Sequence, residues 1–280
     1  VNSYLSDIKS FEKFLKKRKI PFKKVIDNSE VIKNYFRYLT RSKISPRSIK
    51  RKYSSLSSYF TYLIDRKEIK KNPLNSIFTP KLSKKLPVVL SLDEIQRIFK
   101  ESENTDNELL GLRDRCIIEL LYSCGLRVSE LCELRLSNIQ FDANIIRFFG
   151  KGNKERIIPL TFYAKEWLEK YLYQSRHILL SRKSSESKFV FLSNNGKKLT
   201  RAAIWQSIKK YVNAAGVTKS VSPHTFRHSF ATHLVDGGAN LIEIQKLLGH
   251  ADISTTEIYI HLSKEFIDTE YMKAFDKKKN

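Results

Sequence analysis

A proline-bounded basic segment, TPKLSKKLP from Thr79 to Pro87, divides the 280-residue chain into two parts. The segment has no hydrophobic period, so neither a helix nor a strand could bury one face along it. Its prolines and lysines are typical of a linker. The sequence therefore predicts one domain at residues 1–80 and a second at 88–280, joined by a basic linker at 81–87.

Positive charge is concentrated before this linker. Residues 1–86 contain 23 Lys and Arg against 6 Asp and Glu, whereas residues 87–280 contain 29 against 23. The whole chain has a formal charge of +23. Such an excess favours a polyanionic partner, nucleic acid first, because neutralised phosphates release counterions and give affinity without sequence reading. The hydrophobic content of 41% is sufficient for folded cores and excludes an intrinsically disordered chain.

The first domain is expected to be entirely helical. Apolar residues recur at helical spacing in residues 4–15, 31–39 and 56–63, and the Ser45-Pro46 pair is a start signal for the third helix. The exposed side of that helix is expected to carry the basic residues Arg47, Lys50, Arg51 and Lys52. For a single helix, these basic residues are equally well explained as an ordinary face exposed to solvent. The charge of the whole domain, however, favours a phosphate-binding surface.

The second domain is expected to be mixed, with helices around a small sheet. Capping residues and glycine stops predict helices that follow Ser91, run from about 112 to 124, begin near 128, run from 162 to 180, follow Thr200, and run from Ser222-Pro223 to Gly237-Gly238. Strands are expected at 145–149 and 156–160, joined by a GKGNKE hairpin turn, and at 189–192. The fold class is mainly α with a small β-sheet.

Several protein classes are disfavoured. No stretch of about 18 apolar residues occurs, and the first residues lack the apolar run of a signal peptide. We therefore expect a soluble, cytoplasmic protein, associated with the nucleoid and without a membrane partner. The three cysteines, Cys116, Cys124 and Cys132, are odd in number and form no C-x-x-C pair. A disulfide framework and a zinc knuckle are both poor interpretations.

The segment SPHTFRHSFATHL, from Ser222, has the pattern of a chemical site. At 100° per residue His224, Arg227 and His228 fall on one helix face and Phe226 and Phe230 on the other. An imidazole can exchange protons near neutral pH, and a guanidinium can hold phosphate oxygens. An ordinary surface face explains the same pattern equally well. A zinc site on the two histidines has i, i+4 spacing, but no Glu follows the first and no third ligand is evident.

Four other residues are candidates that the pattern alone does not distinguish from ordinary ones. Arg127 follows a helix stop, and Lys151 lies between two glycines at the expected hairpin tip. His250 follows LLG in a loop, and Tyr259 is one of 13 tyrosines. The residues by themselves indicate a DNA-binding protein with a His/Arg cleft.

Four blocks in fixed order carry a resemblance to a known family: CGLRVSELCEL from Cys124, GKGNKERIIPL from Gly150, SPHTFRHSFATHL from Ser222 and LLGHADISTTEIYIH from Leu247. They resemble the signature blocks of the tyrosine site-specific recombinases of the phage integrase family, most closely the Xer type. The resemblance covers nearly all of the chain from about residue 87. The first domain resembles the family's SAM-like, core-binding DNA-binding domain in size and charge. An α+β tyrosine-recombinase catalytic domain is then implied for residues 88–280.

The resemblance implies an active site of two arginines, a lysine, two histidines and a tyrosine. The matching residues are Arg127, Lys151, His224, Arg227, His250 and Tyr259. It implies that the Tyr259 hydroxyl attacks the scissile phosphorus and forms a 3′-phosphotyrosyl intermediate, with no metal or cofactor. Glu130, one helical turn after Arg127, is expected to orient that arginine, although a plain surface glutamate is the alternative.

The resemblance also implies partners. These are double-stranded DNA with a specific recombination site and a tetramer on two sites, formed by this protein alone or with a paralogous recombinase. The tail at 264–280 has apolar residues at near-helical spacing and is expected to dock on a neighbouring protomer, with packing on its own domain as the alternative. The expected role is the resolution of chromosome or plasmid dimers. The alternatives are an integrase or transposase of a mobile element, a type IB topoisomerase-like enzyme, and a non-enzymatic DNA-binding protein.

Overall fold

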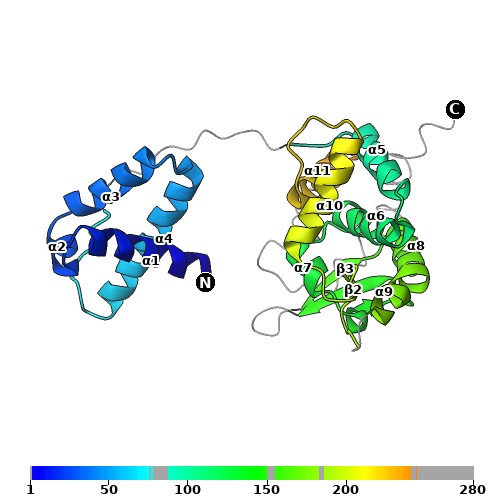
Figure 1. The fold of residues 1–280 in the computed structure, drawn as a ribbon, viewed down its shortest axis with the longest axis horizontal. Coiled ribbons are helices and arrows are strands. Elements are labelled where there is room, and N and C mark those ends of the chain that lie inside the picture. Colours follow the sequence, from blue (N-terminus) through cyan, green and yellow to red (C-terminus); the bar gives the residue numbers. More distant parts are fainter. Residues whose placement is uncertain are drawn as a thin grey trace. The chain divides into compact units, whose positions relative to one another are not determined.

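The structure, a computed structural model, describes residues 2–75, 77, 88–149, 155–182, 186–240 and 244. The chain forms two compact units, Val1–Lys85 and Leu86–Asn280 (Figure 1). The expected linker at 81–87 and the expected docking tail at 264–280 lie outside the described residues. In the described part of the chain no helix is long and apolar enough to cross a membrane.

The first unit is helical, as the periodicity predicted. Its helices are α1 (Asn2–Lys17), α2 (Phe22–Asp27), α3 (Glu30–Arg41) and α4 (Pro46–Asp65). The buried Tyr35 ring joins α3 to α1, because the rings of Phe11 and Phe14 pack on it with centroids 4.9 and 5.0 Å away. The sequence did not indicate α2, since six residues are too few to show a helical period.

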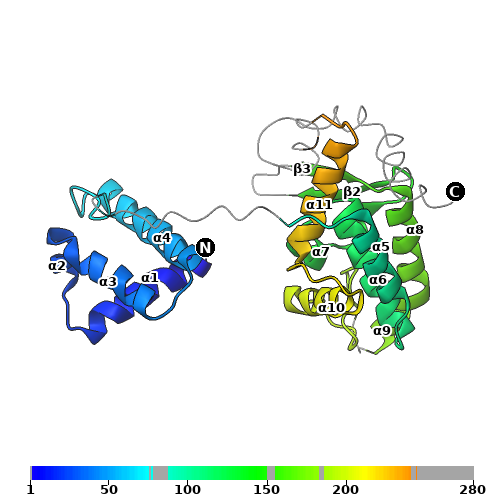
Figure 2. The same cartoon turned by 90° about the horizontal axis from the view of Figure 1, so that it is seen from above.

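The second unit combines helices with one small sheet (Figure 2). Its elements are α5 (Leu92–Glu103), α6 (Glu108–Ser123), α7 (Val128–Glu133), the 3-10 turn η1 (Leu136–Asn138), β1 (Ile139–Gln140), β2 (Ile145–Phe149), β3 (Glu155–Pro159), α8 (Phe162–Tyr171), α9 (His177–Ser181), α10 (Arg201–Ala214) and α11 (Pro223–Asp236). The predicted caps are confirmed: Ser91 and Glu94 form a reciprocal capping box, and Thr200 accepts a hydrogen bond from the Ala203 backbone.

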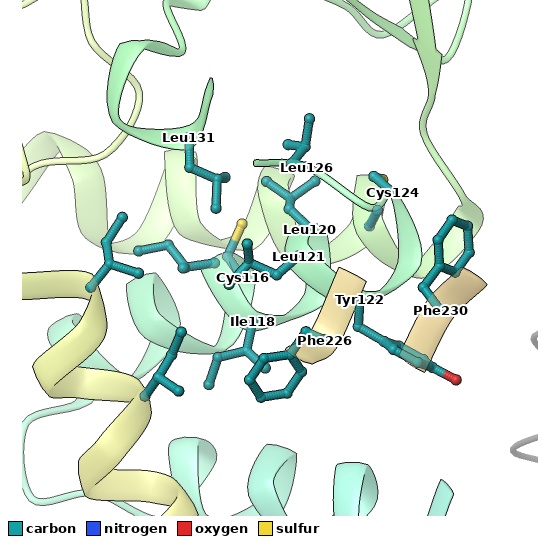
Figure 3. Packing of buried hydrophobic residues seen from close by; sticks show 14 of the residues in the cluster. Cys116, Ile118, Leu120, Leu121, Tyr122, Cys124, Leu126, Leu131, Phe226 and Phe230 are labelled. Carbon is teal, nitrogen blue, oxygen red and sulfur yellow. The ribbon is translucent and has the colours of Figure 1, made fainter. Parts of the chain in front are cut away.

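Helix α6 is the centre of the second unit. It is buried along most of its length and packs against α5, α8 and α11. Figure 3 shows its apolar side chains with Phe226 and Phe230, which α11 contributes to the same core. This packing fixes the position of α11, and therefore the orientation of the opposite face of the HTFRH segment.

Polar groups on α6 are buried with partners. The Arg115 guanidinium lies 3.5 Å from the Phe99 ring centroid and 4.4 Å from that of Trp167, and it pairs with Glu119. The three cysteines are buried. Burial raises the pKa of the Cys116 thiol, which keeps it in the neutral form.

The sheet is antiparallel in the order β1-β2-β3. In the β2–β3 hairpin, Arg147 lies opposite Ile157 and Phe148 lies opposite Arg156. Side chains alternate along a strand, so Arg156 and the fully buried Ile158 share a face. The two strands of the predicted hairpin are confirmed, within one residue.

The expected strand at 189–192 is wrong. Phe189 and Leu192 form only isolated bridges, to Arg135 and Lys198 respectively. The reason is that the Arg176 guanidinium donates hydrogen bonds to three backbone carbonyls between residues 187 and 190. The Leu192 N–H likewise donates to the Tyr171 hydroxyl, so side chains take the place of a continuous strand ladder here.

Two helix predictions need adjustment. The long helix expected at 162–180 consists of α8, a π-helical turn at Leu172–Arg176, and α9. In that turn Ser175 is buried and its hydroxyl donates to the Leu109 carbonyl at 2.7 Å. Helix α6 begins at Glu108 rather than 112, because the Asn107 side chain caps it by accepting from the Leu110 backbone at 3.1 Å.

Candidate active site

Arg127 lies at the start of α7, just after the turn that ends α6. Gly125 in that turn has φ 58°, a left-handed conformation that glycine adopts without strain. Glu130 binds Arg127 twice: one carboxylate oxygen accepts from the Arg127 backbone N–H at 2.7 Å, and the other accepts from its guanidinium at 2.8 Å. The Arg127 side chain remains 35% exposed. The predicted role of Glu130, to orient this arginine, fits these two contacts.

Arg227 reaches the same place from α11. Pro223 begins this helix, and Phe226 and Phe230 bury its apolar face. On the other face the Arg227 guanidinium donates to the Gly125 carbonyl. The turn before α7 therefore connects two segments that are remote in sequence.

A third arginine joins them, which the sequence analysis did not single out. Arg156, on β3, donates from its guanidinium to the Glu130 carboxylate at 2.5 Å, and its side chain is 14% exposed. The signal was available, because Arg156 lies two residues before the apolar Ile158 on a predicted strand and must share its face. We call Arg127, Arg156 and Arg227, together with Glu130, the arginine cluster.

The arginine cluster carries more positive than negative charge. Burial first, and then the positive charges of Arg156 and Arg127, lower the pKa of Arg227 to about 10, while Glu130 acts in the opposite direction. Arg227 is still protonated at neutral pH. Three guanidinium groups around one carboxylate form a site that can hold an anion with two or more oxygens, such as a phosphate diester.

His224 and His228 lie on the same helix as Arg227 but differ in exposure. His224 is exposed in the first turn of α11, whereas His228 is half-buried. Among the described residues no group of three or more His, Cys, Asp or Glu could hold a metal ion. The structure thus brings no described third ligand to the zinc pair that the i, i+4 spacing suggested.

Comparison with known proteins identifies the family. The sequence profile of the Phage integrase family matches residues 88–265, and that of the phage integrase N-terminal SAM-like domain matches residues 1–67. The chain belongs to the phage integrase family. It is a tyrosine recombinase, an enzyme that breaks and rejoins DNA strands in site-specific recombination.

Individual relatives of the recombinase support this result. Tyrosine recombinase XerD of Lacticaseibacillus casei is 44% identical over 212 residues, which cover 76% of this chain and 71% of the relative. XerD of Staphylococcus haemolyticus is 39% identical over 271 residues, 97% of this chain and 90% of the relative. A solved XerH site-specific recombinase, bound to a palindromic difH substrate, superposes with a TM-score of 0.68 over 100% of this chain and 80% of its own, at 23% identity. That last likeness shows the fold alone.

Three of the predicted catalytic residues of the recombinase, Lys151, His250 and Tyr259, lie outside the described residues. Lys151 belongs to the connection between Phe149 and Glu155, which are paired in the β2–β3 hairpin. The structure therefore brings together Arg127, Glu130 and Arg227 of the predicted set, adds Arg156, and leaves His224 exposed on the helix of Arg227.

The basic residues of α4 in the recombinase differ from one another. Arg47 and Lys50 are exposed, as expected. Arg51 and Lys52 both pair with the buried Asp7 of α1, Lys52 at 3.1 Å. The Ser55 hydroxyl donates to the same carboxylate at 2.9 Å.

The placement of Lys52 on the exposed side of α4 is wrong, since its side chain is only 13% exposed. The physical reason is the helical period. Lys52 lies three residues after the buried Ile49 and four before the buried Leu56, so it is on the inward face.

Proposed function

We propose that this recombinase resolves chromosome or plasmid dimers by cutting and rejoining duplex DNA at a specific site through a 3′-phosphotyrosyl intermediate. The arginine cluster is the observation that supports the chemistry, because it gathers charge suited to a scissile phosphate without a metal ion. The XerD relatives, at 39% and 44% identity, favour this role over integration of a mobile element.

In the proposed reaction the Tyr259 oxygen attacks the scissile phosphorus, and the bond from phosphorus to the 5′-oxygen breaks. The products are a 3′-phosphotyrosyl strand and a free 5′-hydroxyl. A 5′-hydroxyl from the partner strand then attacks the same phosphorus and releases the tyrosine. One displacement becomes two nearly isoenergetic ones, so no external energy source is needed.

In this proposal, different residues stabilise the developing charge and transfer the protons. Arg127 and Arg227 hold the non-bridging oxygens and stabilise the charge that grows on them. Tyrosine has an ordinary pKa of about 10, so its proton needs an acceptor at neutral pH, and we assign that role to His224. Lys151 protonates the departing 5′-oxygen, and His250 donates a hydrogen bond to a non-bridging oxygen.

The proposed partners follow from the same likeness. The substrate is double-stranded DNA, bound by both domains, with a tetramer assembled on two sites from this chain alone or with a paralogous recombinase. The solved XerH relative is itself bound to a palindromic DNA substrate. We place the enzyme in the cytoplasm, at the nucleoid.

Mapping covalent adducts on host DNA tests the function, with a Tyr259→Phe strain as the blank. Dimer resolution predicts adducts at a defined site, and a plasmid with two direct copies of that site should separate into two circles. Adducts at the ends of a mobile element would replace the proposal by an integrase role. Relaxation of supercoiled DNA that lacks the site would indicate a topoisomerase-like enzyme.

The exposed residues of α4 are expected to contact DNA phosphates. Replacing Arg47 and Lys50 by alanine should weaken binding to all duplex sequences alike and reduce the slope of log affinity against log salt by about 1 per residue. Fluorescence anisotropy at several salt concentrations measures this. Lys16→Ala is the matched control, because this exposed lysine already pairs with Glu12 at 2.8 Å. An equal change of slope in the control would contradict a specific phosphate contact at Arg47 and Lys50.

The proposed general acid has its own test. Lys151→Ala should slow cleavage of normal DNA by about 10²-fold or more, a typical loss for general acid catalysis. A 5′-bridging phosphorothioate has a better leaving group that needs no proton, so the variant should cleave it nearly as fast as the wild type. Single-turnover rates on both substrates provide the measurement. An equal deficit on both would reassign Lys151 to phosphate binding.

A further inference from the structure

We infer that Arg156 is a positioning residue for DNA cleavage: it holds Glu130, and Glu130 in turn holds Arg127 in the orientation that binds the scissile phosphate. The inference rests on the proposed role of Arg127. Nothing in the sequence pattern had assigned a role to Arg156.

The shared carboxylate carries the argument. One oxygen of Glu130 accepts from two guanidinium groups, from Arg127 at 2.8 Å and from Arg156 at 2.5 Å. The other oxygen accepts from the Arg127 backbone at 2.7 Å. These contacts restrict the orientation of the Glu130 carboxylate. The carboxylate in turn restricts Arg127, which is 35% exposed and the most exposed of these three side chains.

Arg156 and Arg127 differ in solvent exposure, and this difference indicates different roles. Arg156 and Glu130 are 14% and 16% exposed, so they lie behind Arg127 with respect to solvent. A side chain with so little exposure is suited to hold its neighbour in place. Buried charge pairs of this kind impose geometry, because removing one partner leaves the other charge unbalanced.

Arg156 also adjusts the charge of the site. Without it, Glu130 would offset a larger share of the charge of Arg127 and Arg227, and the positive charge available to a phosphate would fall. The charge of Arg156 also lowers the pKa of Arg227, second only to burial, which places Arg156 in the field of the cluster. Arg156 lies on β3, and the connection from β2 to β3 contains Lys151. One residue thus links that hairpin to the cluster.

Arg156→Met provides the test, since methionine keeps much of the volume and removes the charge and the donors. At saturating enzyme, single-turnover cleavage should fall by about 10- to 100-fold, the scale expected when a reacting group is misplaced. DNA affinity should change by less than about twofold. Arg147→Met is the matched control: Arg147 lies on the neighbouring strand and pairs with Glu155, outside the cluster, so its cleavage rate should stay near wild type. Arg156→Lys should recover part of the rate.

A double-mutant cycle with Glu130→Gln decides whether Arg156 acts through Glu130. If it does, Arg156→Met should cost little in the Glu130→Gln background, so the two losses are not additive. Additive losses, or a loss of DNA affinity with an unchanged saturated rate, would overturn the inference. So would a lower melting temperature with an unchanged rate per folded molecule. Failure of Arg127→Met to slow cleavage would instead reject the proposed function.

Discussion

A Tyr259→Phe variant is expected to bind recombination-site DNA as tightly as the wild type and to form no covalent protein–DNA adduct. The reason is that one hydroxyl supplies the nucleophile, while the phenyl ring preserves the shape of the side chain. Adducts that resist denaturation can be counted on a gel with labelled site DNA. Tyr173→Phe is the matched control, because Tyr173 is 77% exposed and should form adducts like the wild type.

This test discriminates among tyrosines, of which the chain has 13. Tyr122 and Tyr171 are buried in the second unit, and burial raises the pKa of both phenols. Neither is suited to lose its proton at neutral pH. Adducts that persist in Tyr259→Phe would nevertheless move the nucleophile to another tyrosine.

Arg227→Met is expected to lower the single-turnover cleavage rate by about 10²- to 10³-fold, the typical loss when one preorganised donor to a developing charge is removed. The thermal stability of the variant should fall much less than its cleavage rate does. In the folded protein this guanidinium is held near two other positive charges, and its pKa is lowered to about 10. Removing such a charge relieves a cost of folding, against which stands the loss of its hydrogen bond to the Gly125 carbonyl.

The sign of the pH dependence follows from this pKa. The folded state holds the Arg227 proton less tightly than the unfolded state, so between pH of about 10 and the ordinary arginine pKa the unfolded state binds more protons. Stability contributed by this group therefore rises with pH through that window. At neutral pH the residue is charged in both states, and its charge opposes folding. A bound phosphate would reverse this effect.

Cleavage rates and thermal melts of Arg227→Met measure both expectations. Arg97→Met is the matched control, because Arg97 also donates to a backbone carbonyl, that of Ala215, but lies on α5 outside the cluster. It should cleave at nearly the wild-type rate. A cleavage rate for Arg227→Met within a few fold of wild type would remove Arg227 from the proposed phosphate site.

For two residues, Lys52 and Arg156, the periodicity of the sequence already indicates the inward face of their elements. Lys52 belongs to the helical period of Ile49 and Leu56, and Arg156 to the strand period of Ile158. The prediction placed Lys52 on the exposed side of α4, and no role was predicted for Arg156. The structure places both, largely shielded from solvent, against a carboxylate: Asp7 for the lysine and Glu130 for the arginine. Periodicity predicts the face of an element more reliably than charge does, provided that a partner of opposite charge is available.

The sequence by itself determined what depends on near neighbours. Helix starts at Ser45, Ser91, Thr200 and Ser222 follow from side chains that bond backbone groups two or three residues away. The strands of the β2–β3 hairpin and the contact of Arg127 with Glu130 are equally local. The ordered motifs predict Lys151, His250 and Tyr259 as catalytic residues, and these assignments stay predictions.

Only the tertiary structure decided which remote groups meet. Arg227 donates to Gly125 because α11 packs its phenylalanines on α6, and the Arg156 side chain extends from β3 to Glu130 on α7. The expected strand at 189–192 was lost to the buried Arg176 for a similar reason. The free energy of burying a charge depends on every group around it, and those groups come together only when the chain has folded.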